Sequence, residues 1–326
     1  MLNNASLHEI AEWLKARDDF ALFAHITPDG DAIGSCIATA LMLEKLGKRA
    51  FVVLPGGMPR VYTGFECSVA WIKAGDPAPF APKYAVSVDV SEYKRMGEGI
   101  ELFESCSGNV MLDHHATNPG FGDLYYIDAQ AAASGEIIVS LIQEAGVAFT
   151  KEMAEWLFIA ISTDCGQFSY SNTRPETLQA AAEMMKAGID VTEITQKLYH
   201  SRTKGRTQLL GTVLSELKTS NDGRMAWAKL TREMLEKTGT THEDAEGIVN
   251  YLNEIEGVEF ACLAEERENG TKLSLRARGN IDVAHQIAIP FGGGGHAKAA
   301  GLTIALDVDT ALQKVLACAQ DALNAQ

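Results

Sequence analysis

The segment FALFAHITPDGDAIGS, residues 20–35, contains the pattern that decides the fold of this chain. Its first five residues form a short apolar run, which predicts a buried strand that ends at His25. A polar loop that contains Gly30 follows, and a helical stretch then runs from Ser35 and stops at Gly47. A strand, a loop and a helix in this order indicate a parallel sheet that is covered by helices.

The same alternation continues through the first half of the chain. Residues 50–54, 84–88 and 109–112 have the composition of further buried strands, and residues 134–146 have the pattern of a helix. We therefore expect the fold class α/β. The N-terminal domain, over residues 1–188, is expected to contain a parallel sheet with helices on both faces.

The second half of the chain has a different character. A polar, helical stretch at 189–214 is interpreted as a linker, and a smaller α+β domain is expected over residues 215–326. In that domain, residues 258–265 and 272–278 form two predicted strands around an Asn-Gly pair, which tolerates the positive φ angles of a tight turn. We expect the functional site in the cleft between the two domains.

Composition and charge limit the classes of function. The chain has 326 residues, of which 46% are hydrophobic and 22% charged, and this suits two globular domains. A net charge of −15 disfavours a protein that coats duplex nucleic acid, although a short phosphorylated ligand is compatible with it. The six cysteines lack the close spacing of a zinc ribbon or a disulfide framework, which indicates reduced thiols.

The chain shows no sign of a membrane segment or of a secretion signal. No apolar run approaches the roughly 20 residues that span a bilayer. Ser6 and Glu9 form a capping box, and residues at helical spacing follow it where a signal peptide would lie. We therefore expect a soluble, cytoplasmic protein that does not bind a membrane.

The first candidate site lies in the loop after the first strand. His25 ends the strand, and Asp29 and Asp31 lie two residues apart in the loop, where both carboxylates can point toward one region. Ligands of open α/β sheets gather at the carboxyl ends of the strands. An isolated pair of aspartates at this spacing is, however, more typical of a solvated turn that caps the following helix.

Three further segments place acidic or imidazole groups at the end of a core element. They contribute Asp89, Asp113, His114, His115 and Asp164. Buried carboxylates are unfavourable unless they are paired or coordinated, so the recurrence of this pattern indicates a metal site. Oxygen and nitrogen ligands without a thiolate favour Mn²⁺ or Mg²⁺ over structural zinc. Because adjacent side chains point in different directions, one histidine of the pair is expected to bind metal and the other to face substrate.

The second domain contains a candidate anion site. On the strand 272–278 a hydroxyl and two guanidiniums alternate with apolar residues, so they share one face. A glycine run at 292–295 exposes backbone N–H groups that a phosphate can approach. Glycines alone favour a flexible hinge, but the histidine and Lys298 that follow favour anion binding. The expected substrate-binding residues are Ser274, Arg276, Arg278, Gly294, Gly295 and His296.

Taken together, these segments resemble the DHH phosphoesterase superfamily, in the branch with a DHH-associated C-terminal domain. The likeness covers nearly the whole chain. It is carried by H-x-x-x-D-x-D from His25, D-H-H from Asp113, S-T-D-x-G-x-F from Ser162 and G-G-G-H-x-x-A-A-G from Gly293. The chain is most similar to the nanoRNases and pAp phosphatases, which hydrolyse short oligoribonucleotides and 3′-phosphoadenosine-5′-phosphate.

The resemblance implies two divalent metal ions, Mn²⁺ in the first place and Mg²⁺ as an alternative. One ion would be bound by His25, Asp29 and Asp89. The other would be bound by Asp31, Asp89, His114 and Asp164, so that Asp89 bridges the two. Asp113 would act from behind the ligands, and His115 would face the scissile phosphate. Arg276, Arg278 and His296 would hold the other end of the substrate, while a water activated by the two metals attacks phosphorus.

The chain departs from the family pattern at two positions. Cys165 stands where Thr is common and Ser169 where we expect Arg, which leaves the substrate preference open but not the metal site. We expect short single-stranded RNA or nucleotide phosphates as substrates, and no duplex nucleic acid. A homodimer is left open.

Several other functions are alternatives to this reading. Three are enzymes of the same superfamily: a phosphodiesterase for linear dinucleotides such as pApA, a RecJ-like single-strand exonuclease and a manganese pyrophosphatase. The acidic charge and the lack of extra binding modules count against the RecJ type. Outside enzymes, the alternative is a nucleotide-binding regulatory module, which usually requires the loss of a metal ligand, and every expected ligand position is filled.

Overall fold

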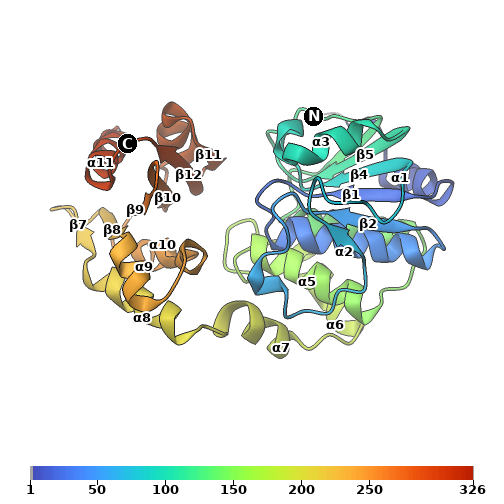
Figure 1. The fold of residues 1–326 in the computed structure, drawn as a ribbon, viewed down its shortest axis with the longest axis horizontal. Helices are drawn as coiled ribbons and strands as arrows, with labels where there is room; N and C mark the ends of the chain where they lie inside the picture. The colour runs from blue at the N-terminus through green and yellow to red at the C-terminus, as the bar shows by residue number, and fades with distance from the viewer. Residues whose placement is uncertain (1–2, 326) are drawn as a thin grey trace. The chain divides into compact units, whose positions relative to one another are not determined.

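The computed structural model describes residues 3–325, which divide into two compact units. The first unit ends at Ser201 and the second begins at Arg202, a point inside the segment 189–214. Each unit contains one sheet and its own set of helices (Figure 1). No helix within residues 3–325 is both long enough and apolar enough to cross a membrane.

The first unit is built on a six-stranded parallel sheet, which confirms the predicted α/β class. Its strand order is β3-β2-β1-β4-β5-β6. The strands are β1 (Phe20–Phe23), β2 (Ala50–Val53), β3 (Trp71–Ile72), β4 (Tyr84–Val88), β5 (Gly108–Asp113) and β6 (Leu124–Ile127). Four of these correspond to predicted strands, whereas the two edge strands, β3 and β6, were not expected.

Both faces of this sheet are covered. Along β1, Phe20 and Leu22 belong to the larger hydrophobic core, and Ala21 and Phe23 to a smaller one on the opposite face. Helices α1, α2, α4 and α5 contribute to the larger core, and η2 and α3 to the smaller. The helices are α1 (Leu7–Lys15), α2 (Gly30–Lys45), η1 (Arg60–Tyr62), η2 (Tyr93–Gly99), α3 (Ile100–Glu104), α4 (Ser134–Glu144), α5 (Lys151–Asp164), α6 (Pro175–Lys186), α7 (Val191–Thr195) and η3 (Gln196–His200).

Helix α2 begins earlier than the sequence pattern indicated. It starts at Gly30 instead of Ser35 because Asp29 is its N-cap. The Asp29 Oδ1 atom accepts hydrogen bonds from the backbone N–H groups of Asp31 and Ala32, both at 3.1 Å. Asp31 therefore lies in the first turn of a helix and not in a loop, which fixes the direction of its side chain.

The second unit is an α+β domain with a mixed sheet, in the order β11-β12-β10-β9-β8-β7. Only β8 and β9 pair in parallel; the other pairs are antiparallel. The strands are β7 (Lys218–Thr219), β8 (Met225–Leu230), β9 (Phe260–Arg267), β10 (Gly270–Ala277), β11 (Gly294–His296) and β12 (Ala299–Ile304). Because β10 ends at Ala277, Arg278 lies one residue outside the strand on which we expected it.

Helices cover both faces of the second sheet as well. Helix α11 and the turn η5 enclose one core, which includes Cys262 and Leu275, and α8, α9 and α10 enclose the other. The helices are α8 (Lys204–Ser215), α9 (Arg232–Thr238), η4 (His242–Ala245), α10 (Ile248–Asn253), η5 (Ala284–Ala288), η6 (Ile289–Phe291) and α11 (Val308–Asn324).

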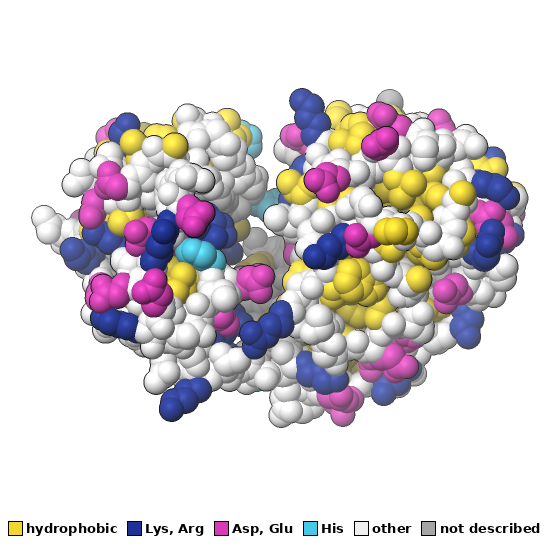
Figure 2. All heavy atoms as spheres, viewed as in Figure 1, with side chains coloured by type: hydrophobic (Ala, Val, Ile, Leu, Met, Phe, Trp, Pro, Cys, Tyr) yellow, Lys and Arg dark blue, Asp and Glu magenta, His cyan; other side chains and the backbone are white. Residues whose placement is uncertain are grey.

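The surface charge is mixed on the face that Figure 2 shows. Lys and Arg side chains are interspersed with Asp and Glu side chains over both units. This face therefore presents no extended basic surface of the kind that follows a nucleic-acid backbone.

Candidate metal centre

The candidate site of the first unit lies at the carboxyl ends of three neighbouring strands. His25 and Asp89 follow β1 and β4 closely, and Asp113 is the last residue of β5. Helix α5 contributes Asp164, its last residue, to the same site. The carboxyl ends of parallel strands meet at one edge of the sheet, where ligands of open α/β sheets bind.

One donor set consists of His25, Asp29 and Asp89. The Nε2 atom of His25 lies 3.8 Å from Asp29 Oδ2 and 3.6 Å from Asp89 Oδ2. His25 and Asp89 are buried, whereas about half of the Asp29 side chain is exposed. This set is therefore open to solvent on the Asp29 side.

A second donor set consists of Asp31, His114 and Asp164. The Nε2 atom of His114 lies 3.4 Å from Asp164 Oδ2, 3.9 Å from Asp31 Oδ2 and 3.6 Å from Asp89 Oδ1. Asp89 thus presents one carboxylate oxygen to each set, the arrangement of a bridging ligand. The structure brings all six expected ligands together.

The N-terminus of α4 holds the aspartates in place. Asp31 accepts hydrogen bonds from the backbone N–H groups of Ser134, at 2.7 Å, and Gly135, at 2.9 Å. The Ser134 hydroxyl donates to Asp89 Oδ1 at 3.1 Å. The positive end of a helix stabilises carboxylates in this way. On the other side of the site, His114 Nδ1 lies 3.2 Å from the carbonyl oxygen of Ala131, which leaves Nε2 for a metal.

His115 is oriented by a buried pair behind the ligands. Its Nδ1 atom lies 2.8 Å from Asp113 Oδ1, and the amide of Asn118 donates to Asp113 Oδ2. Burial acts to raise the pKa of Asp113, but the hydrogen bonds from His115 and Asn118 outweigh it and hold that pKa below its usual value. The contact between Nδ1 and Asp113 fixes the direction of the His115 ring.

Three carboxylates of the site resist ionisation while no cation is bound. Burial raises the pKa of Asp31. Burial, with the repulsion of Asp31 in addition, raises the pKa of Asp89 and of Asp164 well above the usual value. Several carboxylates buried next to one another repel, and a nearby positive charge would stabilise them as anions.

The donor sets fit divalent cations. Octahedral ligands about 2.1 Å from a metal lie about 3 Å from one another. The nitrogen–oxygen distances of 3.4 to 3.9 Å are longer than hydrogen bonds and close to that spacing. Carboxylates and imidazoles without a thiolate are the donors of Mn²⁺ and Mg²⁺ sites.

In the second unit, strand register places four of the expected substrate-binding residues on one face. Ser274 pairs with Gly301 and Arg276 with Ala299 across β10 and β12. Those two residues pair in turn with Gly294 and His296 on β11. Paired residues point to the same side of a sheet, so Ser274, Arg276, Gly294 and His296 share a face. The Arg276 guanidinium is held by Asn250 Oδ1 at 3.0 Å, and Arg278 is exposed beyond the strand.

The second half of the glycine run lies in the sheet, because Gly294 and Gly295 belong to β11. A Cβ atom on Gly293 would lie 2.3 Å from Gly301 O, and one on Gly295 would lie 2.5 Å from Ala299 O. These glycines therefore let β11 approach β12 closely. Lys298, which we associated with anion binding, donates instead to the carbonyl oxygens of Gly279 and Ile281 and so holds their loop.

Comparison with known proteins assigns the family. Residues 19–161 match the model described as "DHH family, N-terminal domain", and residues 222–324 match the DHHA1 domain. A protein of Thermus thermophilus, named bifunctional oligoribonuclease and PAP phosphatase NrnA, is 35% identical over 97% of this chain and 94% of its own length. The chain belongs to the DHH phosphoesterase family. The predicted superfamily, its NrnA-like branch and the prediction of a hydrolytic enzyme are confirmed.

Solved structures agree with this assignment. An exopolyphosphatase-related protein of Bacteroides fragilis superposes with a TM-score of 0.90 and 27% identity, over 98% of this chain and 95% of that one. A RecJ exonuclease bound to manganese superposes with a TM-score of 0.54 and 15% identity, over 97% of this chain and 94% of that one. The likeness to RecJ is one of fold alone.

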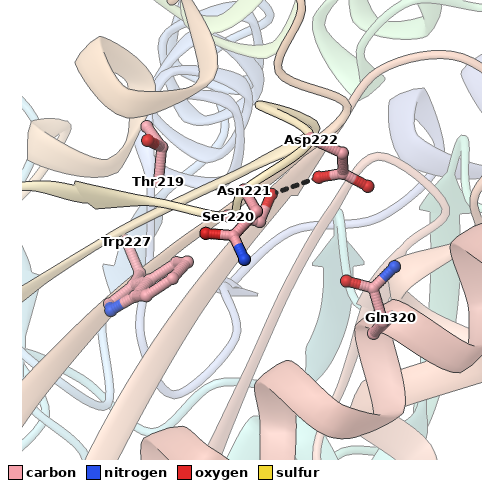
Figure 3. A pocket seen from close by; sticks show the side chains of 6 residues that line it. All are labelled: Thr219, Ser220, Asn221, Asp222, Trp227 and Gln320. Carbon is pink, nitrogen blue, oxygen red and sulfur yellow. Dashed lines mark hydrogen bonds between the residues drawn. The ribbon is translucent and has the colours of Figure 1, made fainter.

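The DHHA1 domain also contains a pocket that none of the expected site residues lines. Its volume is about 410 Å³, and its lining residues are Thr219, Ser220, Asn221, Asp222, Trp227 and Gln320 (Figure 3). Trp227 pairs with Cys262 and belongs to the α11 face, opposite Ser274 and Arg276. Because no lining side chain is cationic, this pocket offers little to a phosphate.

Several residues of the DHH-domain site were not found from the sequence. Ser134 and Gly135 hold the aspartates through backbone N–H groups, and the start of a helix at 134 was the only signal for them. Asn118 and Arg95 reach the site from a loop and from η2, and no spacing pattern marks either. Arg95 is the only one of these that brings a positive charge.

Proposed function

We propose that this DHH protein is a Mn²⁺- or Mg²⁺-dependent phosphoesterase that releases mononucleotides from short oligoribonucleotides and converts 3′-phosphoadenosine-5′-phosphate to AMP and phosphate. The observation that carries the proposal is the pair of donor sets, with Asp89 in one set and its other carboxylate oxygen 3.6 Å from His114 of the second. The NrnA relative supports the choice of substrates, and the manganese in the RecJ structure supports the choice of metal.

The six ligands are proposed to hold two metal ions. His25, Asp29 and Asp89 would bind one, and Asp31, Asp89, His114 and Asp164 the other. Two such ions supply a water of lowered pKa and stabilise negative charge on the phosphoryl group. No nucleophilic serine or cysteine is required.

The remaining residues of the DHH-domain site are proposed to serve the substrate. His115, oriented by Asp113, would present Nε2 to the scissile phosphate and stabilise the charge that develops there. Asp113 is itself fully buried, so it acts through His115 and not on substrate directly.

The DHHA1 domain is proposed to bind the end of the substrate that does not react. Ser274, Arg276 and His296 share one face, and the small residues Gly294 and Gly301 between them let a phosphate come close to the backbone. Gly295 and Arg278 flank this face and are proposed to take part. Recognition of the far end would favour short substrates.

The test is a product analysis with purified protein. The protein is stripped with EDTA, supplied with Mn²⁺, and incubated with a labelled ladder of two- to ten-nucleotide RNAs, pAp, pApA and pyrophosphate. We expect mononucleotides from the shortest RNAs and AMP from pAp, with no turnover in EDTA. Asp89→Ala should lower the rate by about a thousand-fold or more, because both metals lose a ligand.

An exposed aspartate of the same domain provides the matched control. Asp76→Ala removes the same charge from a surface loop and should leave the rate unchanged. Full activity in Asp89→Ala would refute the assignment. Cleavage of pApA alone would favour the dinucleotide phosphodiesterase, processive cleavage of the long RNAs a RecJ-like exonuclease, and nucleotide binding without turnover a regulatory module.

A further inference from the structure

An arginine that takes no part in the expected ligand set lies beside it. The Nη2 atom of Arg95 lies 3.3 Å from His25 Nδ1, on the side of the ring away from Asp29 and Asp89. Arginine can only donate hydrogen bonds, so His25 is the acceptor. A half-buried guanidinium therefore borders the donor set of His25, Asp29 and Asp89.

The backbone around Arg95 is built to keep it there. Arg95 belongs to η2, whose chain turns at Gly97 with a φ of 55°. The N–H of Ile26, the residue after His25, donates to the Arg95 carbonyl oxygen at 2.7 Å. A Cβ atom on Gly97 would lie 2.4 Å from Ile26 Cγ2, so a glycine is needed for this approach. The segment with Arg95 is thus fixed directly to the segment with His25.

Within residues 3–325, the side chain of Arg95 makes two hydrogen bonds with its five N–H donors. Its second contact is Nη1 to the Ser91 hydroxyl, again at 3.3 Å. Among residues 3–325, no carboxylate forms an ion pair with this guanidinium, although acidic residues surround the site. A guanidinium has five N–H donors in a planar fork that suits two oxygens of one phosphate.

Metal binding at His25 would free Arg95 further. When a neutral imidazole coordinates through Nε2, the proton resides on its other nitrogen. Nδ1 is then a donor and no longer accepts from Arg95. The guanidinium would then need another hydrogen-bond acceptor next to the donor set of His25, Asp29 and Asp89.

The net charge of the metal-loaded site also favours a cationic side chain such as Arg95 next to it. Asp29, Asp31, Asp89, Asp113 and Asp164 contribute five negative charges, and two dications would contribute four positive ones. The loaded site would still be negative by one charge and would repel an anionic substrate. Arg95 brings the balance to zero.

We propose that Arg95 binds a non-bridging oxygen of the substrate's reacting phosphate, on the His25 side of the metal centre. This inference rests on the proposed phosphoesterase function and adds a substrate contact to it. Within the described residues no carboxylate forms an ion pair with the guanidinium, so a substrate phosphate can form a direct charge-assisted contact with it.

The test compares Arg95→Gln and Arg95→Lys with Lys94→Gln, which removes an exposed positive charge from the adjacent position. We expect Arg95→Gln to lower kcat/KM for pAp by about 10- to 100-fold, as for the loss of hydrogen bonds to a charged group. Arg95→Lys should recover part of that loss, because lysine restores the positive charge but not the planar set of N–H donors. Lys94→Gln should match the wild type.

Calorimetry supplies readouts that do not depend on turnover. Inorganic phosphate should bind to the Mn²⁺-loaded wild type and to Lys94→Gln, and at least 10-fold more weakly to Arg95→Gln. Mn²⁺ itself should bind the Arg95 variants within about 3-fold of the wild type, because Arg95 is not a metal ligand. Phosphate binding remains measurable even if the chain hydrolyses none of the tested substrates, so the two proposals can fail separately.

Two results would overturn the proposal. A parallel loss of Mn²⁺ affinity and activity in both Arg95 variants would show that Arg95 only supports His25. Equal kcat/KM and phosphate affinity in Arg95→Gln and Lys94→Gln would show that it makes no substrate contact.

Discussion

Asp89 is the central residue of the candidate metal site. It faces both donor sets, is buried, and has a φ of 60°, a left-handed conformation that residues other than glycine rarely adopt. Its N–H donates to Leu112 O at 3.0 Å, so β5 holds the strained backbone in place. Strain of order 1–3 kcal/mol and the burial of a carboxylate are both tolerated here, as is common at functional sites.

Replacing Asp89 with asparagine tests how much the buried charge of Asp89 lowers the stability of the metal-free protein. Asparagine has the same shape and tolerates the left-handed conformation, so the change mainly removes a buried charge. At pH 7 and without metal, Asp89→Asn should raise the melting temperature of the DHH domain by about 2–4 °C for each kcal/mol of repulsion relieved. Asp76→Asn, on the surface, should have no effect. The melting temperature is measured in EDTA by calorimetry.

The pH dependence of that difference follows from the raised pKa of Asp89. The native state binds a proton here more tightly than the unfolded state, so the carboxylate lowers the stability of the metal-free protein as pH rises above the unfolded value of about 4. Below that value the carboxyl is protonated in both states. The advantage of Asp89→Asn should therefore shrink as pH falls toward 4, and an advantage independent of pH would contradict the electrostatic explanation.

At the scale of elements, two glycines let helices α2 and α5 approach each other closely next to the site. Figure 1 shows α2 and α5 side by side, and they are in extensive contact. A Cβ atom on Gly30 would lie 2.4 Å from Thr163 Oγ1, and one on Gly34 would lie 2.2 Å from Trp156 O. This approach brings Asp31, in the first turn of α2, near Asp164 at the end of α5.

Gly34→Ala tests this close approach. Alanine favours a helix by about 1 kcal/mol over glycine, but here its methyl group would collide with backbone. We expect the DHH domain to lose about 1–3 kcal/mol of unfolding free energy, measured by urea denaturation. The control is Gly211→Ala in α8, where a Cβ atom meets nothing within 4 Å, and it should stabilise the second unit by up to about 1 kcal/mol. A stabilised Gly34→Ala would contradict the packing argument.

The elements also show what the sequence could and could not predict. Buried strands such as β1, β2, β4 and β5 were predictable because each is a continuous apolar run. The edge strands β3 and β6 were not, since one has two residues and the other is mostly half-buried, so neither has a clear hydrophobic pattern. Most of the proposed metal ligands follow such apolar runs closely, whereas the position of Arg95 depends on a turn at Gly97 that no hydrophobic periodicity predicts.

At the scale of the whole molecule, the chain consists of two units with separate cores. The cores of the DHH domain draw on residues up to Tyr199, and those of the DHHA1 domain on residues from Leu209 onward. The six expected metal ligands all belong to the first unit. Metal binding should therefore act on the stability of one unit directly and on the other only through coupling between them.

Calorimetry of the full chain can test this division. With Mn²⁺ at 100 times its dissociation constant, each ion bound to the native state adds about 2.7 kcal/mol to the DHH domain, which corresponds to a rise of about 5 to 10 °C in its melting temperature per ion. We expect two transitions, of which only one moves with Mn²⁺ and returns in EDTA. Gly34→Ala should lower the temperature of the metal-sensitive transition, and Gly211→Ala should raise the temperature of the other. These shifts assign each transition to its unit. A single transition, or equal shifts of both with Mn²⁺, would mean that the two units unfold together and that the metal site stabilises the whole chain.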